Sequence, residues 1–165
     1  MKKSALFFIS VLFSISCYAQ DYIEVSPDEW SFMTDTSAFN GVSRAAFIIG
    51  TSNSRYVPTP VLSVNQTDGQ PVKVFLAYMP ADLCGGCTLL IRFNTDTTVY
   101  QLPVIYSYQL KRYTVLFDST LTSYQFINKI HSNKSLSIRL MNAVSVTDVK
   151  FSLNGATTAL MKLNQ

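Results

Sequence analysis

Charged residues are scarce in this sequence: they make up 14% of its 165 residues, against ~25% in an average soluble domain. Hydrophobic residues make up 48% and the formal net charge is only +3, which excludes intrinsic disorder, since disorder needs low hydrophobicity and high net charge. The chain also lacks the basic stripe that nucleic-acid binding requires, because Lys111 and Arg112 form its densest basic cluster. We therefore expect a folded protein with no nucleic-acid partner.

Glycine and proline are also sparse, with six of each. Their scarcity excludes collagen-like and low-complexity chains. It also leaves no phosphate-binding loop, because Gly85 and Gly86 do not lead into a helix. No internal repeat and no linker divides the chain, and the length is close to the ~150 residues of one domain. We predict a single domain over residues 20–165.

Long apolar runs are missing except for one, over residues 5–15. This run follows a positively charged start and precedes small residues, which is the pattern of a secretory signal peptide. We predict a signal peptide over residues 1–19, cleaved between Ala19 and Gln20, and export to the periplasm. The run is too short to span a bilayer and no second run follows, so we predict no transmembrane segment in the mature chain.

Two alternatives to a cleaved signal peptide stay open. The apolar run could form a buried N-terminal helix. Alternatively, Cys17 could be lipidated and anchor the protein to a membrane. Lipidation sites usually carry leucine three residues before the cysteine and a small residue directly before it. Ser14 and Ser16 occupy these positions, so half of the pattern is met.

Cysteine is rare as well, and after cleavage only Cys84 and Cys87 remain of the three. Two cysteines in an exported chain normally pair, and Gly85-Gly86 between them suits a tight hairpin turn. We predict a structural disulfide between Cys84 and Cys87. A redox-active pair is the first alternative, but a strand rather than a helix is predicted after Cys87, so no helix N-terminus would lower the pKa of a thiol. A metal site is the second alternative.

The single histidine limits the catalytic chemistry that the chain can support. There is no G-x-S-x-G nucleophile motif, and His131 falls at the end of a predicted helix, where we expect it to be solvated. Asp82, Asp96 and Asp118 could pair for glycoside hydrolysis, but each lies beside a turn, where aspartate commonly bonds the local backbone. Two cysteines and one histidine are too few for a four-ligand zinc site. We expect no enzyme activity, no metal and no cofactor.

Alternating apolar residues rich in β-branched and aromatic side chains dominate the mature chain. We predict strands over residues 30–33, 44–49, 61–64, 72–78, 88–93, 98–102, 113–117, 136–140 and 144–153, with a loop over residues 51–54. Pro103 is expected to end its strand, and the alternation slips at Thr147-Asp148, where a turn or bulge is expected. About eight or nine short strands at regular spacing predict a mainly antiparallel β-sandwich or open barrel.

Two short helices are predicted near the C-terminus. The first begins after the N-cap residues at 118–120 and ends near His131. In it, Phe126 or Tyr124, together with Ile127 and Ile130, should face the core. The second covers residues 156–163, with its apolar side chains on one face.

Tyrosine is concentrated in one stretch, at positions 100, 106, 108, 113 and 124. The simplest interpretation is an ordinary aromatic sheet face. The functional interpretation is a recognition surface for a protein partner, because tyrosine offers a large contact area with a polar tip. We assign this candidate surface to Tyr106, Tyr108, Lys111, Arg112 and Tyr113. The two cationic residues would orient an acidic partner.

The second half of the chain carries a set of short apolar motifs. These are residues 87–94 (CTLLIRFN), 124–130 (YQFINKI), 134–140 (KSLSIRL) and 151–155 (FSLNG), followed by Ala159-Leu160. Their order resembles that of small exported bacterial proteins, the periplasmic accessory proteins of type VI secretion and the invasion-associated locus B proteins. The resemblance implies an exported β-rich protein without a shared catalytic motif, so it transfers no site residue.

These observations predict a non-catalytic exported binding or assembly module, such as an accessory of a secretion or envelope system. The alternative is a small periplasmic inhibitor or immunity-type protein that blocks a toxin or a hydrolase. A thiol–disulfide redox protein using Cys84 and Cys87 is a third, weaker alternative. Whether the protein binds a small molecule is left open by the sequence.

Overall fold

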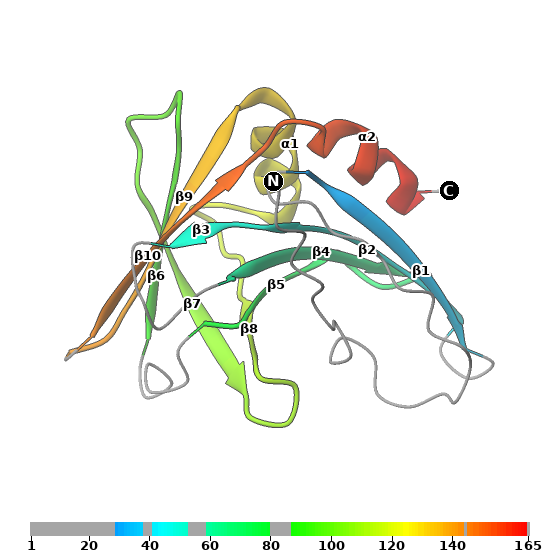
Figure 1. Ribbon diagram of the computed structural model, residues 1–165, viewed down its shortest axis with the longest axis horizontal. Coiled ribbons are helices and arrows are strands. Elements are labelled where there is room, and N and C mark those ends of the chain that lie inside the picture. Colours follow the sequence, from blue (N-terminus) through cyan, green and yellow to red (C-terminus); the bar gives the residue numbers. More distant parts are fainter. Residues whose placement is uncertain (1–28, 38–40, 53–58, 80–86, 144, 165) are drawn as a thin grey trace, which may run out of the picture.

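The computed structural model describes residues 29–37, 41–52, 59–79, 87–143 and 145–164. Within these ranges, ten strands form one antiparallel sheet, and two short helices lie on one side of it (Figure 1). The strands are β1 (Ser31–Ser37), β2 (Gly41–Ile49), β3 (Thr51–Ser52), β4 (Val61–Thr67), β5 (Lys73–Ala77), β6 (Thr88–Phe93), β7 (Tyr100–Ser107), β8 (Arg112–Val115), β9 (Ser135–Met141) and β10 (Val146–Ser152). The helices are α1 (Ser123–Ser132) and α2 (Ala156–Met161), and the 3₁₀ turn η2 (Lys162–Asn164) continues α2. The predicted mainly antiparallel β fold is confirmed, and the sheet is not a closed barrel.

The sheet has the order β1-β2-β4-β5-β8-β7-β6-β9-β10-β3. Strand β7 joins two halves of the sheet, β1-β2-β4-β5-β8 and β6-β9-β10-β3. Its residues 100–103 pair with β6, and its residues 104–107 pair with β8. Pro103 therefore lies within this strand, and the prediction that it ends the strand is wrong. It lies where the pairing changes from one neighbour to the other, and its carbonyl accepts a hydrogen bond from the Leu116 N–H at 3.0 Å. A proline is tolerated there because it removes only a donor.

The two halves meet a second time at Gly50, between β2 and β3. Strand β2 pairs with β4, whereas the two residues of β3 pair with Val149 and Lys150 of β10. The loop expected over residues 51–54 is therefore a short strand in its first half, and residues 53–54 lie outside the described residues. The Gly50 N–H donates to the Pro60 carbonyl at 2.8 Å, and a Cβ at position 50 would lie 2.6 Å from the Phe151 ring. Only glycine fits this close approach of backbone to ring.

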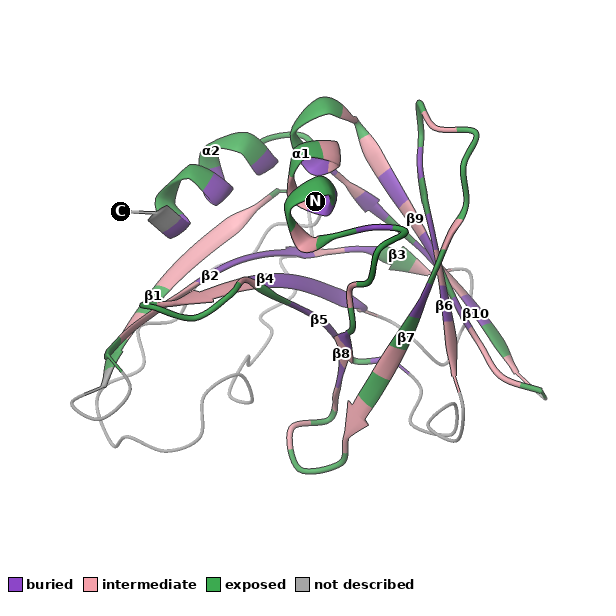
Figure 2. Cartoon of the chain, turned by 180° about the vertical axis from the view of Figure 1, so that it is seen from behind, coloured by how far each residue is buried: buried purple, intermediate pink, exposed green. Residues whose placement is uncertain are grey.

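The main core lies between the sheet and the helices, and a smaller cluster of Phe47, Val61 and Ala77 lies on the other face of β2, β4 and β5. These three strands therefore carry unbroken runs of buried residues (Figure 2). In β6, by contrast, alternate residues point into the main core, namely Leu89, Ile91 and Phe93. Strand β10 places Thr147 in the same inward series as Val149, and its register with β9 is unbroken. The bulge expected at Thr147-Asp148 is therefore absent. The alternation of apolar residues in the sequence breaks here because Thr147, a polar residue, occupies an inward position, while Val146 faces out and is 55% exposed.

Helix α1 begins with a capping box. The Gln125 N–H donates to Thr122 Oγ1 at 3.2 Å, and the Thr122 N–H donates to Gln125 Oε1 at 2.9 Å. Phe126 and Ile130 are buried from this helix, and α2 buries Ala159 and Leu160.

The predicted core face of α1 needs a correction in its details. Ile130 and Phe126 are buried as expected, but Ile127 is only half-buried and Tyr124 is 74% exposed. The fully buried contacts come from Phe126 and Ile130, four positions apart, and the half-buried Ile127 packs against the core beside them.

Several predictions lie outside the described residues. These are the signal peptide, its cleavage between Ala19 and Gln20, the alternative lipidation of Cys17, and one partner of the predicted disulfide, Cys84. No helix in the part of the chain that the structure describes has the length and apolar character needed to cross a bilayer.

Candidate functional site

The β7–β8 hairpin carries the predicted recognition residues and projects away from the side of the sheet on which the helices lie (Figures 1 and 2). Its strands pair through Tyr106 opposite Tyr113 and Ser107 opposite Arg112. Its tip is closed by the Leu110 N–H, which donates to Ser107 Oγ at 3.3 Å. The tip thus has a defined conformation.

The aromatic residues of the hairpin form a stack that runs from the core to the surface. Tyr113 is 1% exposed, Tyr106 is half-buried, and Tyr108 at the tip is 73% exposed. The Tyr106 ring lies 4.7 Å from the Tyr113 ring and 5.0 Å from the Tyr108 ring, the latter pair edge to face. The exposed ring of Tyr108 therefore rests on a buried aromatic base. This geometry lowers the entropy lost when a partner covers it.

The two cationic residues of the predicted surface differ in role. Lys111 is exposed at the tip, with a positive φ of 48°. The Arg112 guanidinium lies 3.8 Å from the centre of the Phe75 ring, and its Nε is buried without a hydrogen-bond partner. Burial lowers the pKa of Arg112 from its usual value. The structure thus places all five predicted residues on one hairpin but not on one surface, because Arg112 lies on the strand face opposite to Tyr106 and Tyr113. It exposes Tyr108 and Lys111, half-buries Tyr106 and Arg112, and places Tyr113 in the core.

Of the other residues that the sequence singled out, Asp82 lies outside the described residues, and the rest make local contacts. His131 is exposed in the last turn of α1, as expected, and its Nδ1 lies 3.0 Å from Thr157 Oγ1. Asp118 accepts hydrogen bonds from both the N–H and the hydroxyl of Thr120, and these bonds hold its pKa below the usual value. Asp96 is bound by Lys129. Among the described residues, no three histidine, cysteine, aspartate or glutamate side chains lie close enough together to hold a metal ion.

The region of the predicted disulfide is described only at one end. Cys87 is half-buried directly before β6. Strand β5 pairs with β4 and β8, and β6 pairs with β7 and β9, so the two strands flanking the Cys84–Cys87 segment do not pair with each other. The disulfide stays a prediction.

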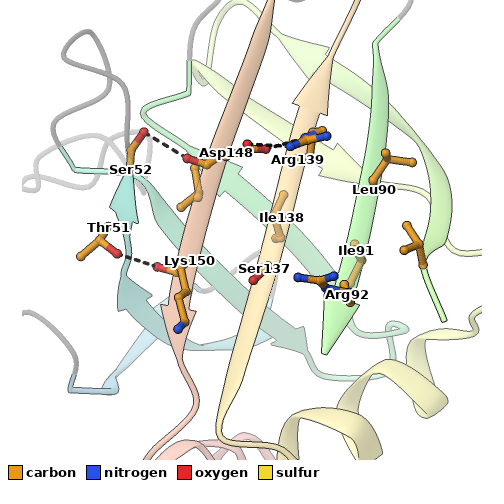
Figure 3. Close-up of a pocket in the computed structure, with 12 residues that line it drawn as sticks. Thr51, Ser52, Leu90, Ile91, Arg92, Ser137, Ile138, Arg139, Asp148 and Lys150 are labelled. Atoms are coloured by element: carbon orange, nitrogen blue, oxygen red, sulfur yellow. Dashed lines mark hydrogen bonds and ion pairs between the residues drawn. The ribbon is translucent and has the colours of Figure 1, made fainter. Parts of the chain in front are cut away.

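A second feature, which the sequence did not reveal, is a groove of about 580 Å³ on the opposite half of the sheet (Figure 3). It lies on the face of β6, β9, β10 and β3 that is turned away from the helices. Its polar lining comes from Arg92, Ser137, Arg139, Asp148 and Lys150, together with the β3 residues Thr51 and Ser52. No local motif could have predicted the groove, because strand register alone brings these residues together.

One ion pair crosses the groove. Arg139 Nε lies 2.6 Å from Asp148 Oδ1, and Arg139 Nη2 lies 2.8 Å from Asp148 Oδ2. These hydrogen bonds lower the pKa of Asp148 and so favour its ionised form.

Comparison of the chain with protein-family models, with curated proteins and with solved structures finds no match.

Proposed function

We propose that this protein is an exported, non-catalytic binding or assembly module that engages a protein partner through the tip of its β7–β8 hairpin. The observation that carries the proposal is the stack of Tyr108 on Tyr106 and Tyr113, which presents a large, preorganised aromatic surface. Tyrosine is enriched among the residues that dominate binding energy at protein interfaces. The partner expected here offers a pocket for the Tyr108 ring and an acidic group for Lys111.

The likeness of the motifs between residues 87 and 160 to periplasmic secretion accessories supports an assembly in the cell envelope. Within that proposal, the helices and the core hold the sheet in place, and the hairpin makes the contact.

A matched pair of tyrosine variants tests the proposal. Tyr108→Ser and Tyr124→Ser remove residues of the same type and nearly equal exposure, 73% and 74%. Wild-type protein and Tyr124→Ser should retain the same partner from a periplasmic extract, and Tyr108→Ser should lose it. Titration calorimetry with the purified partner should then show binding weakened about tenfold or more by Tyr108→Ser. Equal retention by all three proteins would reject the hairpin as the binding element.

An inhibitor or immunity-type protein is the second candidate, and one feature of the hairpin favours it. Ile105 is 58% exposed on the strand face opposite to Tyr106, so the hairpin carries apolar side chains on both of its faces. A projecting element of this kind can fill the cleft of a hydrolase. Loss of the purified partner's enzymatic activity on binding would select this candidate over an assembly role.

A further inference from the structure

The groove on the outer half of the sheet contains a row of three polar residues on adjacent strands. Arg92 of β6 is directly opposite Ser137 of β9, and Ser137 is directly opposite Lys150 of β10. Adjacent strands lie about 4.8 Å apart, so the backbones of the two cationic residues are separated by about 10 Å. Figure 3 shows Arg92 and Lys150 on either side of Ser137. Both side chains are long enough to reach one group bound above the serine hydroxyl.

The two cations of this row have no ion-pair partner among the residues that the structure describes. Arg92 and Lys150 are both exposed. Asp148 is the one carboxylate among the described lining residues, and Arg139 Nε and Nη2 both hydrogen-bond to it. The groove therefore has two available positive charges, one of them a planar guanidinium suited to bidentate contact with an oxyanion.

Apolar side chains lie beside the cationic row. Leu90 is half-buried next to Arg139, and Val99, which also lines the groove, is 52% exposed. A volume of about 580 Å³ is within the range of small-molecule sites. The site therefore has room for an anionic group and a short apolar extension.

We infer that this groove binds a small ligand that bears an oxyanion, a carboxylate or a phosphate ester, on a short aliphatic chain. The oxyanion lies between Arg92 and Lys150 and accepts a hydrogen bond from Ser137, and the chain packs on Leu90 and Val99. The site is independent of the β7–β8 hairpin, because it uses strands of the other half of the sheet.

Titration followed by amide NMR tests this inference, with four probes at low salt: pentanoate, butyl phosphate, inorganic phosphate and butanol. We expect saturable shifts at residues 92, 137 and 150 with pentanoate or butyl phosphate. Whichever of the two binds more tightly identifies the chemistry of the natural ligand. Inorganic phosphate should bind more weakly than butyl phosphate, and butanol should not bind. Absence of saturable shifts at these residues with both anionic probes would overturn the inference.

Charge variants separate a built site from general attraction to a cationic protein. Arg92→Gln and Lys150→Gln should each weaken binding about tenfold, and Ser137→Ala should weaken it less. Lys73→Gln removes an exposed lysine of β5, outside the groove, and should leave affinity unchanged. All four positions are on the surface or half-buried, so circular dichroism should confirm that each variant folds. An equal loss of binding in Lys73→Gln would show non-specific attraction and reject the site.

Discussion

Lys129 links helix α1 to the turn between β6 and β7. Its ammonium group lies 2.5 Å from Asp96 Oδ2, which also accepts a hydrogen bond from the Tyr100 hydroxyl at 3.1 Å. The hydrogen bond from Lys129 holds the pKa of Asp96 below its usual value, and the same bond raises the pKa of Lys129. The folded state therefore favours the charged forms of both Asp96 and Lys129. Their ion pair should stabilise the fold only over the pH range in which both groups are charged.

The stability contributed by this pair should depend on pH at both ends. Because the folded-state pKa of Asp96 is lowered, its contribution is present above the unfolded value of about 3.9 and is lost as the pH falls through the folded value. Because the pKa of Lys129 is raised, its contribution is complete below about pH 10.4 and is lost as the pH rises through the folded value. Denaturant unfolding of wild type and Asp96→Asn should therefore differ at pH 7 and converge in acid. An unchanged difference at low pH would contradict the role of the carboxylate.

Helix α1 shows how closely local sequence predicts an element and where that prediction fails. The N-cap signal at residues 118–120 predicted the start a few residues too early. The N-cap is Thr122, which forms the capping box with Gln125, whereas Asp118 bonds Thr120 in the turn before the helix. The apolar positions predicted a helix but could not show which of Tyr124, Phe126 and Ile127 is most deeply buried. That depends on the curvature of the sheet beneath the helix.

Burial in α1 predicts an unequal response to two similar substitutions. Ile130→Ala should lower the free energy of unfolding by ~2–5 kcal/mol, because Ile130 is 1% exposed and truncation leaves a cavity. Ile127→Ala should cost less, because Ile127 is half-buried. Tyr124→Ala should change stability by less than ~0.5 kcal/mol, as for a surface residue. Denaturant titrations measure all three, and a larger loss from Ile127 than from Ile130 would show that the helix face is wrong.

The local sequence also predicted most of the strands, but it could not predict how neighbouring strands pair. Alternation predicted strands such as β6, β9 and β10, because one face of each is buried in the core, whereas β2, β4 and β5 bury residues on both faces. It failed at Pro103 and Thr147, where an atypical residue is accommodated by the pairing of neighbouring strands. The tyrosine-rich hairpin was visible from composition, whereas the Arg92–Ser137–Lys150 row was not. That row depends on the register of three strands far apart in the sequence.

At the scale of the whole molecule, Gly50 holds the two halves of the sheet together by allowing β2 to pass into β3. Gly50→Ala should lower the free energy of unfolding by ~1–3 kcal/mol, because the added methyl group would overlap the Phe151 ring and the Lys150 carbonyl. Combining it with Phe151→Leu should cost less than the sum of the two single losses, since both changes act on one contact. Strict additivity in denaturant unfolding would contradict the close approach as the cause.

Export is the second property of the whole molecule that can be checked directly. The charged start and the apolar run over residues 5–15 predict that protein from a periplasmic extract begins at Gln20. Amino-terminal sequencing and intact mass measure this. A retained Met1 or a lipid on Cys17 would contradict cleavage after Ala19.

The tip of the β7–β8 hairpin is proposed to contact a protein partner in the cell envelope. The most direct measurement replaces Tyr108 by a photoreactive phenylalanine analogue, with the same replacement at Tyr124 as the control, and crosslinks in intact cells. Position 108 should give one discrete crosslinked product, and position 124, which is nearly as exposed on α1, should give none. No product from position 108, or the same product from both positions, would contradict this proposal.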